Sequence, residues 1–281
     1  MLDIIITRFA PSPTGYLHIG HAYSALLAWR TAKEAGGRFI LRIEDIDGGR
    51  CKPEFEQAIY EDLAWLGIEW ETPVRRQSEH LADYADALAR LAAQGLTYPC
   101  FCTRGDIKAE LGRIGGAPHD GIAGPVYPGT CRGLSDHDRA DRLAAGKVHA
   151  IRLRMAEAVS RTGAISWHDL DRGTVIGDPL RHGDVVLARK DIPTSYHLAV
   201  TSDDALQGIT QVTRGEDLVE FTDIHGLLQA LLGLAAPQYR HHKLLTDANG
   251  RRYAKRDRSL TIRALRAAGI TAEEVRGMTG F

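Results

Sequence analysis

The chain opens with a change in hydrophobic period. Leu2 to Phe9 is rich in β-branched and apolar residues over a length that suits one buried parallel strand. A helix is predicted to begin near Gly20, because apolar residues then recur at its i, i+3, i+4 and i+7 positions: Ala22, Ala25, Leu26 and Trp29. Arg38 to Ile43 alternates as a second strand. Strand, helix and strand in this order form a βαβ unit, which predicts an α/β fold with a parallel sheet.

The pattern continues with predicted helices over Pro53 to Leu66 and over Ser78 to Gln94, the second capped by Ser78. Six strand-like segments follow: Val148 to Arg154, Ile165 to Asp169, Thr174 to Gly177, Val185 to Ala188, Tyr196 to Val200 and Ile209 to Thr213. We expect the first four, with the cysteine-containing region before them, to form an insertion, and the last two to return to the parallel sheet. Helices over 223–234, 260–268 and 271–279 complete the prediction.

The connection between the first strand and helix carries candidate chemistry. Two prolines and a glycine break regular structure there. We expect the turn to leave backbone N–H groups at the positive end of the helix, which suits a phosphate. His18 and His21 are three residues apart at this opening, so both can face one ligand. Either histidine alone is more often a surface or capping residue.

Glu44 follows the second strand, and ligands of open α/β sheets collect at the carboxyl ends of the strands. We therefore expect Glu44 beside the two histidines, where its carboxylate could hold an ammonium group. A solvated acidic turn is the alternative. Tyr196 and Arg214 are each predicted at a strand end, although a single arginine is more often a surface charge.

The stretch from Tyr98 to Cys131 is rich in glycine and proline and cannot build much core. Bound zinc would compensate, and Cys100, Cys102 and Cys131 supply three thiolates. His119 and His137 are candidates for the fourth ligand, because imidazole is a common zinc ligand. Three buried free thiols are the alternative. Cys51 stands apart and is expected to hold no metal.

Composition limits the possible partners. The formal net charge of -1 and the pI near 6.9 argue against nucleic-acid binding through overall basicity, so such a partner must meet a local patch. Residues 240–266 contain nine Lys or Arg against two Asp, a net charge of +7. No apolar run approaches the roughly 20 residues that span a bilayer, and a secretory signal is not recognisable. We expect a cytoplasmic monomer without membrane contact.

The string from Arg8 to His21 contains Pro-Ser-Pro-Thr-Gly followed by His-Ile-Gly-His, which resembles the signature of class I aminoacyl-tRNA synthetases. The longer string is similar to the glutamate-specific branch. The resemblance implies a Rossmann-like catalytic domain in which His18, Gly20 and His21 bind ATP and the two histidines act in catalysis. Magnesium would accompany the ATP rather than occupy a cage of its own.

The same resemblance implies a glutamate pocket. Arg42 to Asp45 matches the branch in which Glu44 contacts the α-amine, and the strings at 196–199 and 212–218 resemble pocket-lining segments. A glutamate ligand brings two carboxylates, and Arg8 and Arg214 offer planar forks that bind carboxylates. The implied pocket residues are Arg8, Ser12, Glu44, Tyr196 and Arg214.

Residues 252–256 occupy the place of the family's second signature, Lys-Met-Ser-Lys-Ser, of which Lys255 alone is unchanged. The resemblance implies that Lys255 holds the ATP phosphates and follows the leaving pyrophosphate. A solvated basic loop is the alternative.

The cysteine pattern resembles that of glutamyl-queuosine tRNA(Asp) synthetases, which implies one structural zinc on Cys100, Cys102, Tyr127 and Cys131. The loop between Cys102 and Tyr127 is longer and richer in glycine than that pattern. The chain also ends two short helices after Lys255, so we expect no anticodon-binding domain. The resemblance then implies activation of glutamate without tRNA and its transfer to the queuosine base in the anticodon of tRNA(Asp).

Two other functions stay open: a truncated glutamyl-tRNA synthetase that charges tRNA 3′ ends, and a non-catalytic tRNA-binding paralogue. The expected domain organisation places the nucleotide- and glutamate-binding domain at 1–97 and 190–236, the inserted zinc subdomain at 98–189, and a basic segment with the Lys255 loop at 237–281.

Overall fold

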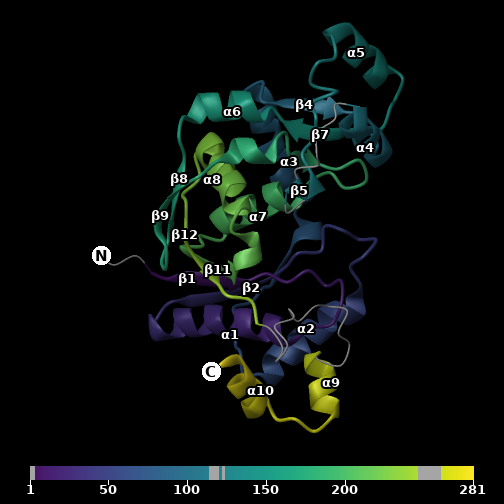
Figure 1. Ribbon diagram of the computed structural model, residues 1–281. Coiled ribbons are helices and arrows are strands. Elements are labelled where there is room, and N and C mark those ends of the chain that lie inside the picture. The colour runs from purple at the N-terminus through teal and green to yellow at the C-terminus, as the bar shows by residue number, and fades with distance from the viewer. Residues whose placement is uncertain (1–3, 114–119, 122–123, 246–260) are drawn as a thin grey trace.

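The computed structural model describes residues 4–113, 120–121, 124–245 and 261–281. Its N-terminal half begins with the predicted βαβ unit: β1 (Ile6–Phe9), α1 (Ile19–Glu34) and β2 (Arg38–Ile43). The two strands pair in parallel, from Ile6 opposite Arg38 to Phe9 opposite Leu41. Figure 1 shows α1 on one face of these strands, with later helices of the chain on the other. The predicted α/β fold with a parallel sheet is confirmed.

The sheet continues beyond β1 through segments that are distant in sequence. Thr210 N donates to Ile6 O at 3.0 Å, which places the strand after Thr210 beside β1. Two runs of hydrogen-bonded strands therefore lie side by side, with β1 next to β11 (Gln211–Gly215). The first run is β3 (Arg75–Arg76), β2 and β1, and the second is β11, β12 (Gln238–His242), β8 (Ser166–Asp169) and β9 (Gly173–Ile176). Strands β11, β12 and β8 run parallel, and β9 pairs antiparallel with β8.

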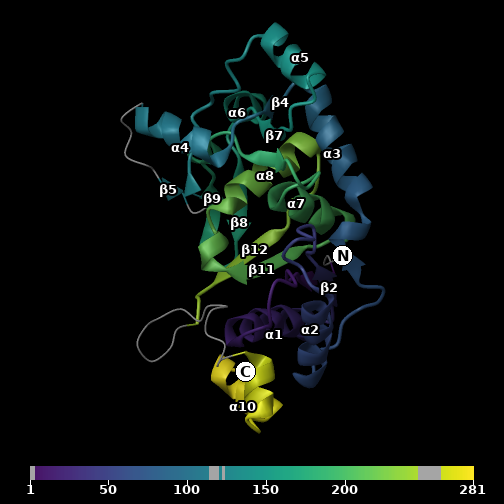
Figure 2. The same cartoon turned by 90° about the vertical axis from the view of Figure 1, so that its right-hand side faces the viewer.

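A smaller antiparallel sheet contains β4 (Thr97–Cys100), β7 (Ala150–Leu153) and β10 (Val186–Ala188) in the order β10, β7, β4. It lies at the end of the molecule opposite the C-terminus, together with α4 (Arg104–Arg113), α5 (Asp136–Ala144) and α6 (Met155–Thr162) (Figure 1). In Figure 2 α4 and α3 (Leu81–Ala93) lie on opposite sides of this end. A short pair of strands, β5 (Asp120–Gly121) and β6 (Gly124–Pro125), completes this region.

Helices α2 (Pro53–Trp65), α7 (Tyr196–Leu206), α8 (Phe221–Leu232), α9 (Ile262–Ala267) and α10 (Ala272–Thr279) complete the fold. The helices predicted over 53–66, 223–234, 260–268 and 271–279 are therefore confirmed within a few residues at their ends. One apolar core lies between α1, α2 and the C-terminal helices, and a second lies around α7 and α8. Among the described residues, no helix combines the length and apolarity needed to cross a membrane.

The strand predicted over Tyr196 to Val200 is wrong, because these residues begin α7. The Ser195 side chain accepts from Leu198 N and caps the helix. Every residue from Leu198 to Asp204 is buried, so the helix has no polar face that would reveal its period in the sequence.

Two further expectations are corrected. The segments 165–169 and 174–177 form strands as predicted, but they join the main sheet through β8 and β12 rather than an inserted unit. The division of the chain at residues 98 and 189 stays a prediction. Ser78 does not cap α3, which begins at Leu81. Instead, the Ser78 hydroxyl donates to Asp45 Oδ2 at 2.6 Å and ties a 3₁₀ turn to the end of β2.

Buried ion pairs join α7 to the strands beneath it. Asp203 is fully buried and accepts from Arg75 Nε at 2.7 Å, Gln77 Nε2 at 2.8 Å and Tyr84 OH at 2.9 Å. Asp204 accepts from Arg8 Nε at 3.1 Å and from Arg42 Nη2 at 2.8 Å. Burial opposes the ionisation of Asp204, but the charges of Arg8 and Arg42 hold its pKa below its ordinary value. These two carboxylates therefore anchor α7 to β1, β2 and α3.

Replacement of Asp203 by alanine should lower the free energy of unfolding by about 3 to 5 kcal/mol, because it leaves the buried Arg42 and the half-buried Arg75 without this partner. Urea denaturation followed by circular dichroism measures the loss. Asp86→Ala, at an exposed position on α3, is the matched control and should change stability by less than about 0.5 kcal/mol. Equal stability of the two variants would contradict an anchoring role.

Candidate functional site

Two histidine rings cover the N-terminus of α1. His18 precedes the helix, and its Nδ1 accepts from Gly20 N at 3.1 Å. His21 Nδ1 accepts in return from His18 N at 3.2 Å, and the two ring centroids are 3.8 Å apart. A β-carbon at Gly20 would lie 3.0 Å from His18 Cε1, so glycine permits the close approach of this ring. The predicted pairing of the histidines at one opening is confirmed.

These hydrogen bonds determine the tautomers of both rings. A backbone N–H can only donate, so each Nδ1 is unprotonated, and a neutral ring carries its proton on Nε2. The expectation that the turn leaves its N–H groups for a phosphate is wrong for Gly20 and His18, because the imidazoles already accept from them. At this helix end the imidazole N–H groups are therefore at Nε2.

The C-terminal part of the chain returns to this same turn. Ile262 N donates to Leu17 O at 2.9 Å, and Thr261 forms a β-bridge with His18. At the end of β12, His242 Nε2 lies 2.5 Å from Ser24 Oγ on α1. Lys255 lies outside the described residues. The described residues on either side of its segment nevertheless both contact the beginning of α1.

Arg214 is a buried cation at the carboxyl end of β11, with 6% of its surface exposed. Its guanidinium donates to His241 Nε2 at 3.1 Å and to Thr222 Oγ1 at 2.7 Å, and its Nη1 lies 3.1 Å from His225 Nδ1. Among the described residues it forms no ion pair. Because its partners are neutral oxygen and nitrogen atoms, the positive charge of Arg214 is solvated by the protein but not cancelled by it.

Histidines surround this arginine, and burial keeps them neutral. Burial, with the charge of Arg214 next in importance, lowers the pKa of His241 to about 4 and that of His225 well below its ordinary value. Burial and the charges of His182 and Arg214 lower the pKa of His197 to about 3. At neutral pH these rings therefore add hydrogen-bond acceptors and no positive charge around Arg214.

The other predicted pocket residues converge on the same edge of the sheet. Glu44 directly follows β2, and its N–H donates to Pro11 O at 3.0 Å in the turn that also contains the half-buried Ser12. Burial raises the pKa of the Glu44 carboxyl, against the charge of Arg42. Tyr196, at the start of α7, has its pKa raised by burial, and the charges of Arg214, Glu44 and Arg8 all act on its hydroxyl. The prediction that Tyr196 lies at a strand end is wrong, but the helix brings it to the expected place.

Arg8 is more fully occupied than the sequence suggests. Its Nε and Nη2 donate to the two carboxylate oxygens of Asp204 at 3.1 and 3.4 Å, and its Nη1 donates to Thr213 O at 3.3 Å. Three of its five N–H groups are therefore engaged. The sequence predicted that the Arg8 guanidinium is available to a ligand carboxylate, but Asp204 already occupies the edge formed by Nε and Nη2.

The three predicted cysteine ligands come together in the small antiparallel region. The sulfur atoms of Cys100, Cys102 and Cys131 all lie within 4.8 Å of one another. Tyr127 OH lies 3.5 Å from Cys102 Sγ and accepts from Cys131 N at 2.8 Å. Burial raises the pKa of Cys102 to about 11.

These distances suit a tetrahedral zinc, whose bonds of about 2.3 Å to sulfur place two thiolates about 3.8 Å apart. The alternative ligand His137 is on α5, where its exposed ring lies 3.4 Å from Asp141. His119 lies outside the described residues. Cys51 is apart from the cluster, with its Sγ 4.0 Å from Glu44 O.

The chain matches the family described as tRNA synthetases class I (E and Q), catalytic domain, over residues 4–277. The chain belongs to this family. As a class I aminoacyl-tRNA synthetase catalytic domain it is a ligase, which confirms the resemblance carried by the histidine motif. The roles of single residues in the site stay predictions.

Two relatives within the family that align with nearly the whole chain carry the same name. A protein from Rhodobacter capsulatus, named glutamyl-Q tRNA(Asp) synthetase, is 49% identical over 99% of this chain and 100% of its own length. A protein of the same name from Symbiobacterium thermophilum is 44% identical, over 98% of this chain and 85% of its own. The resemblance to this branch of the class I synthetases is therefore confirmed.

A solved structure extends the comparison to the fold. The glutamate-tRNA synthetase of Elizabethkingia anophelis is 30% identical, with a TM-score of 0.78 over 91% of this chain and 53% of that chain. This chain thus spans about half the length of that solved synthetase.

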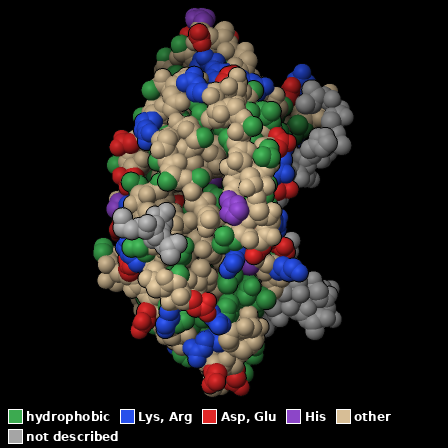
Figure 3. Space-filling model, turned by 90° about the vertical axis from the view of Figure 1, so that its left-hand side faces the viewer, with side chains coloured by type: hydrophobic (Ala, Val, Ile, Leu, Met, Phe, Trp, Pro, Cys, Tyr) green, Lys and Arg blue, Asp and Glu red, His purple; other side chains and the backbone are tan. Residues whose placement is uncertain are grey.

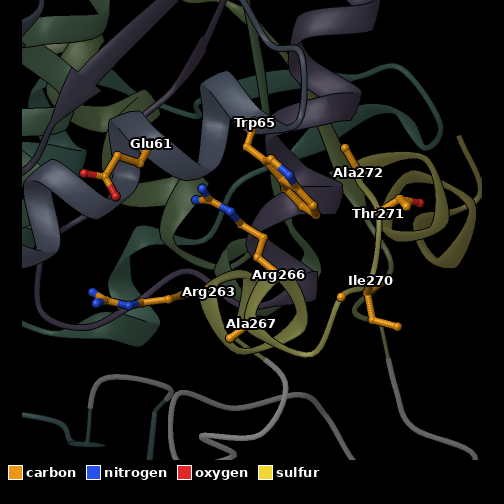
Figure 4. A pocket seen from close by; sticks show the side chains of 9 residues that line it. Glu61, Trp65, Arg263, Arg266, Ala267, Ile270, Thr271 and Ala272 are labelled. Carbon is orange, nitrogen blue, oxygen red and sulfur yellow. The ribbon is translucent and has the colours of Figure 1, made fainter.

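A surface hollow of about 600 Å³ between α2 and α9 was not expected from the sequence (Figure 4). Arg266 lies over the ring of Trp65, 5.3 Å from its centroid, and pairs with Asp62 at 3.2 Å. Burial raises the pKa of Asp62 to about 6. Arg263 donates to Tyr16 OH at 3.1 Å in the loop before the two histidines. Arg263 and Arg266, which line the hollow, both belong to the basic segment at 240–266.

Figure 3 shows the distribution of charged side chains over one face of the molecule. The coloured basic and acidic side chains are interspersed there. The distribution on this face agrees with the near-neutral composition, and contact of the 240–266 segment with nucleic acid stays a prediction.

The histidines around Arg214 predict a loss of stability in mild acid. Their pKa values are lower in the folded protein than the value of 6.5 that applies when the chain is unfolded. The unfolded chain therefore binds more protons below that pH, and the free energy of unfolding should fall as the pH drops from 6.5 toward 4. Urea midpoints measured at intervals across this range test the slope.

His241→Gln removes one group that takes up a proton on unfolding. The slope of the free energy of unfolding against pH should therefore decrease by the equivalent of about one proton per molecule. His137→Gln, at the exposed position on α5, should leave the slope unchanged. A urea midpoint independent of pH between 6.5 and 4.5 in the unmodified protein would contradict the assignment of neutral histidines.

Proposed function

We propose that this protein activates glutamate with ATP and transfers the glutamyl group to a tRNA. The observation that carries the proposal is the buried Arg214, which has hydrogen-bond partners but no ion pair among the described residues. A buried cation without a counter-ion is costly, and a ligand carboxylate would offset that cost. Glutamate is the amino acid whose γ-carboxylate suits this position within a class I synthetase fold.

The α-amino and α-carboxylate groups of glutamate would bind on the side of Tyr196 that is opposite Arg214. The carboxylate of Glu44 accepts the α-ammonium group, with Ser12 in the adjoining turn. Within the described ranges Arg8 keeps two N–H groups after its bonds to Asp204 and Thr213, and these can direct the α-carboxylate toward ATP. The two carboxylates of the substrate thus meet two different arginines.

Activation needs no covalent intermediate on the protein. The α-carboxylate oxygen attacks the α-phosphorus of ATP in line, a new O–P bond forms, and the bond to pyrophosphate breaks. The Nε2–H donors of His18 and His21 stabilise the charge on the α-phosphoryl oxygens, and Lys255 stabilises the departing pyrophosphate. Magnesium bound to the incoming ATP would neutralise part of its charge.

The acceptor we propose is the queuosine base in the anticodon of tRNA(Asp). The near full-length relatives from two organisms are named glutamyl-Q tRNA(Asp) synthetase, which supports this choice. A hydroxyl of the acceptor attacks the glutamyl carbonyl, and AMP leaves. The second candidate, attachment to a tRNA 3′ end, is favoured by the likeness to a solved glutamate-tRNA synthetase.

The purified protein should catalyse glutamate-dependent exchange between ATP and pyrophosphate without any RNA. Arg214→Ala should raise the KM for glutamate by about 100-fold or more, because it removes a charged hydrogen-bonding partner. The KM for ATP should change little. Arg240→Ala, at a half-buried position on the neighbouring strand, is the matched control. Equal loss for both substrates in Arg214→Ala would contradict the pocket assignment.

The position of the transferred glutamate separates the acceptors. Periodate oxidation of the queuosine in tRNA(Asp) before the reaction should abolish transfer to that base, and nuclease mapping should locate the label in the anticodon. Label on the 3′-terminal ribose of tRNA(Glu) would favour the second candidate. Protein that binds tRNA but never exchanges pyrophosphate would be a non-catalytic paralogue.

We also propose that Cys100, Cys102, Cys131 and Tyr127 hold one structural zinc. The supporting observation is the convergence of three sulfur atoms and one phenol in a region with a small apolar core. Zinc would supply folding energy there rather than chemistry.

Metal analysis of protein purified without chelators should give about one zinc per chain. Cys131→Ser should reduce the zinc content and lower the melting temperature, because it removes one of four ligands. Tyr127→Phe should weaken zinc binding without removing a thiol, and Cys51→Ser should keep the full zinc content. Unmodified protein without zinc would leave the three cysteines as ordinary thiols.

A further inference from the structure

Three adjacent parallel strands each place one polar side chain in a row beside the glutamate pocket. Arg214 is on β11 and is directly opposite His241 on β12. Asp169 ends β8, the next strand of the sheet. His241 Nδ1 lies 2.7 Å from Asp169 Oδ2, and its Nε2 accepts from Arg214 Nε at 3.1 Å. Both Asp169 and His241 are buried, with no exposed side-chain surface in either.

The direction of each hydrogen bond in this row follows from the chemistry of its groups. A guanidinium N–H can only donate, so His241 Nε2 must be unprotonated. The proton of the neutral ring is then on Nδ1, where it donates to the carboxylate of Asp169. The other oxygen of Asp169 accepts from the backbone N–H groups of Asp171 and Arg172 at 2.9 and 3.1 Å, which fixes the carboxylate in place.

A second branch leaves Arg214 on the side of α8. Its Nη1 donates to His225 Nδ1, so His225 Nε2 carries the proton and donates to His197 Nδ1 at 3.2 Å. Thr222 Oγ1 accepts from Nη2 and lies 3.2 Å from His241 Nε2, so it links Arg214 and His241 a second time. Partners from the described part of the chain engage three of the five N–H groups of Arg214, and one on each terminal nitrogen has no such partner there.

The imidazole of His241 also separates two charges. A carboxylate in direct contact with Arg214 would neutralise it and compete with the substrate. With His241 between them, Asp169 determines the orientation of the guanidinium without occupying its two remaining N–H groups. The row therefore fixes the orientation of the Arg214 guanidinium and leaves its positive charge available to a ligand carboxylate.

We propose that Asp169 and His241 are positioning residues that set the affinity of this enzyme for an amino acid with a second carboxylate. They act through Arg214 and do not touch the substrate. The proposal rests on the proposed function, because it takes Arg214 as the partner of the γ-carboxylate. Asp169 and His241 are both outside the pocket predicted from the sequence. Asp169 is on a strand that the sequence pattern placed in the insertion.

Asp169→Asn tests the proposal with little change in shape. The amide oxygen of asparagine can still accept from the N–H groups of Asp171 and Arg172, so the turn is retained. The amide nitrogen, however, donates to His241 Nδ1 and forces the ring proton onto Nε2, against the N–H of Arg214. The KM for glutamate in pyrophosphate exchange should rise about tenfold or more, with the KM for ATP unchanged. Asp171→Asn, in the same turn but exposed, is the matched control.

The ring nitrogen NMR shifts of His241 give a readout independent of activity. They should show the Nδ1–H tautomer in the unmodified protein and the Nε2–H tautomer in Asp169→Asn. His241→Gln is the second variant: its amide oxygen can accept from Arg214 but lacks the link to Asp169, so it should raise the KM for glutamate less than Asp169→Asn does. A shared loss of glutamate and ATP affinity together with a lower melting temperature would indicate a merely structural role.

Two results would overturn the positioning role. The first is a changed tautomer with an unchanged KM for glutamate, and the second is an Nε2–H tautomer in the unmodified protein. If the unmodified protein fails to exchange pyrophosphate, the proposed function fails instead. The tautomer measurement still decides in that case whether Asp169 orients Arg214.

Discussion

The structure depends on how it places buried arginines against buried carboxylates. Asp203 and Asp204, near the end of α7, accept from arginines on β1, β2 and β3. Such charges are expensive to bury singly, and breaking one pair leaves its partner uncompensated. The network therefore ties a helix from late in the sequence to strands from its beginning, and it holds the carboxyl edge of the sheet, where the candidate site lies, in one arrangement.

Arg214 differs from the other buried arginines because its partners are neutral. Arg8 and Arg42 are compensated by Asp204, whereas Arg214 is surrounded by a threonine hydroxyl and imidazole nitrogens. A compensated arginine stabilises the fold, and one that is hydrogen-bonded but not compensated is prepared for an anion. The same edge of the sheet thus contains two arginines that are paired with a carboxylate and one, Arg214, that is bonded to neutral groups.

Neutral histidines recur at both ends of the candidate site. At the start of α1, His18 and His21 accept backbone N–H groups through Nδ1 and keep their proton on Nε2. Around Arg214, His225 and His241 accept from the guanidinium and pass their proton away from it. In both places a donor of known direction determines the tautomer. The imidazoles then offer donors where phosphate is proposed to bind and acceptors where a cation must be held.

Local patterns in the chain determined the βαβ unit, most of the helices and the residues of the signature turn. Short-range periodicity and turn chemistry decide such features, and the Arg8 to His21 string is specific enough to indicate the family. Composition made Cys100, Cys102 and Cys131 candidate metal ligands, because a glycine-rich stretch with little apolar core needs another source of stability, but it left free thiols open, and only the structure brings the three sulfur atoms together.

Tertiary structure alone decided the rest. The segment at Tyr196 is rich in strand-forming residues, yet it is a helix because burial on all sides removes the polar face that reveals a helical period. The transfer of β8 to the main sheet, the closure of Arg8 by Asp204 and the row from Asp169 to Arg214 join residues that are 27 to 196 positions apart. Contacts over such separations leave no local pattern, because each partner alone reads as an ordinary polar residue.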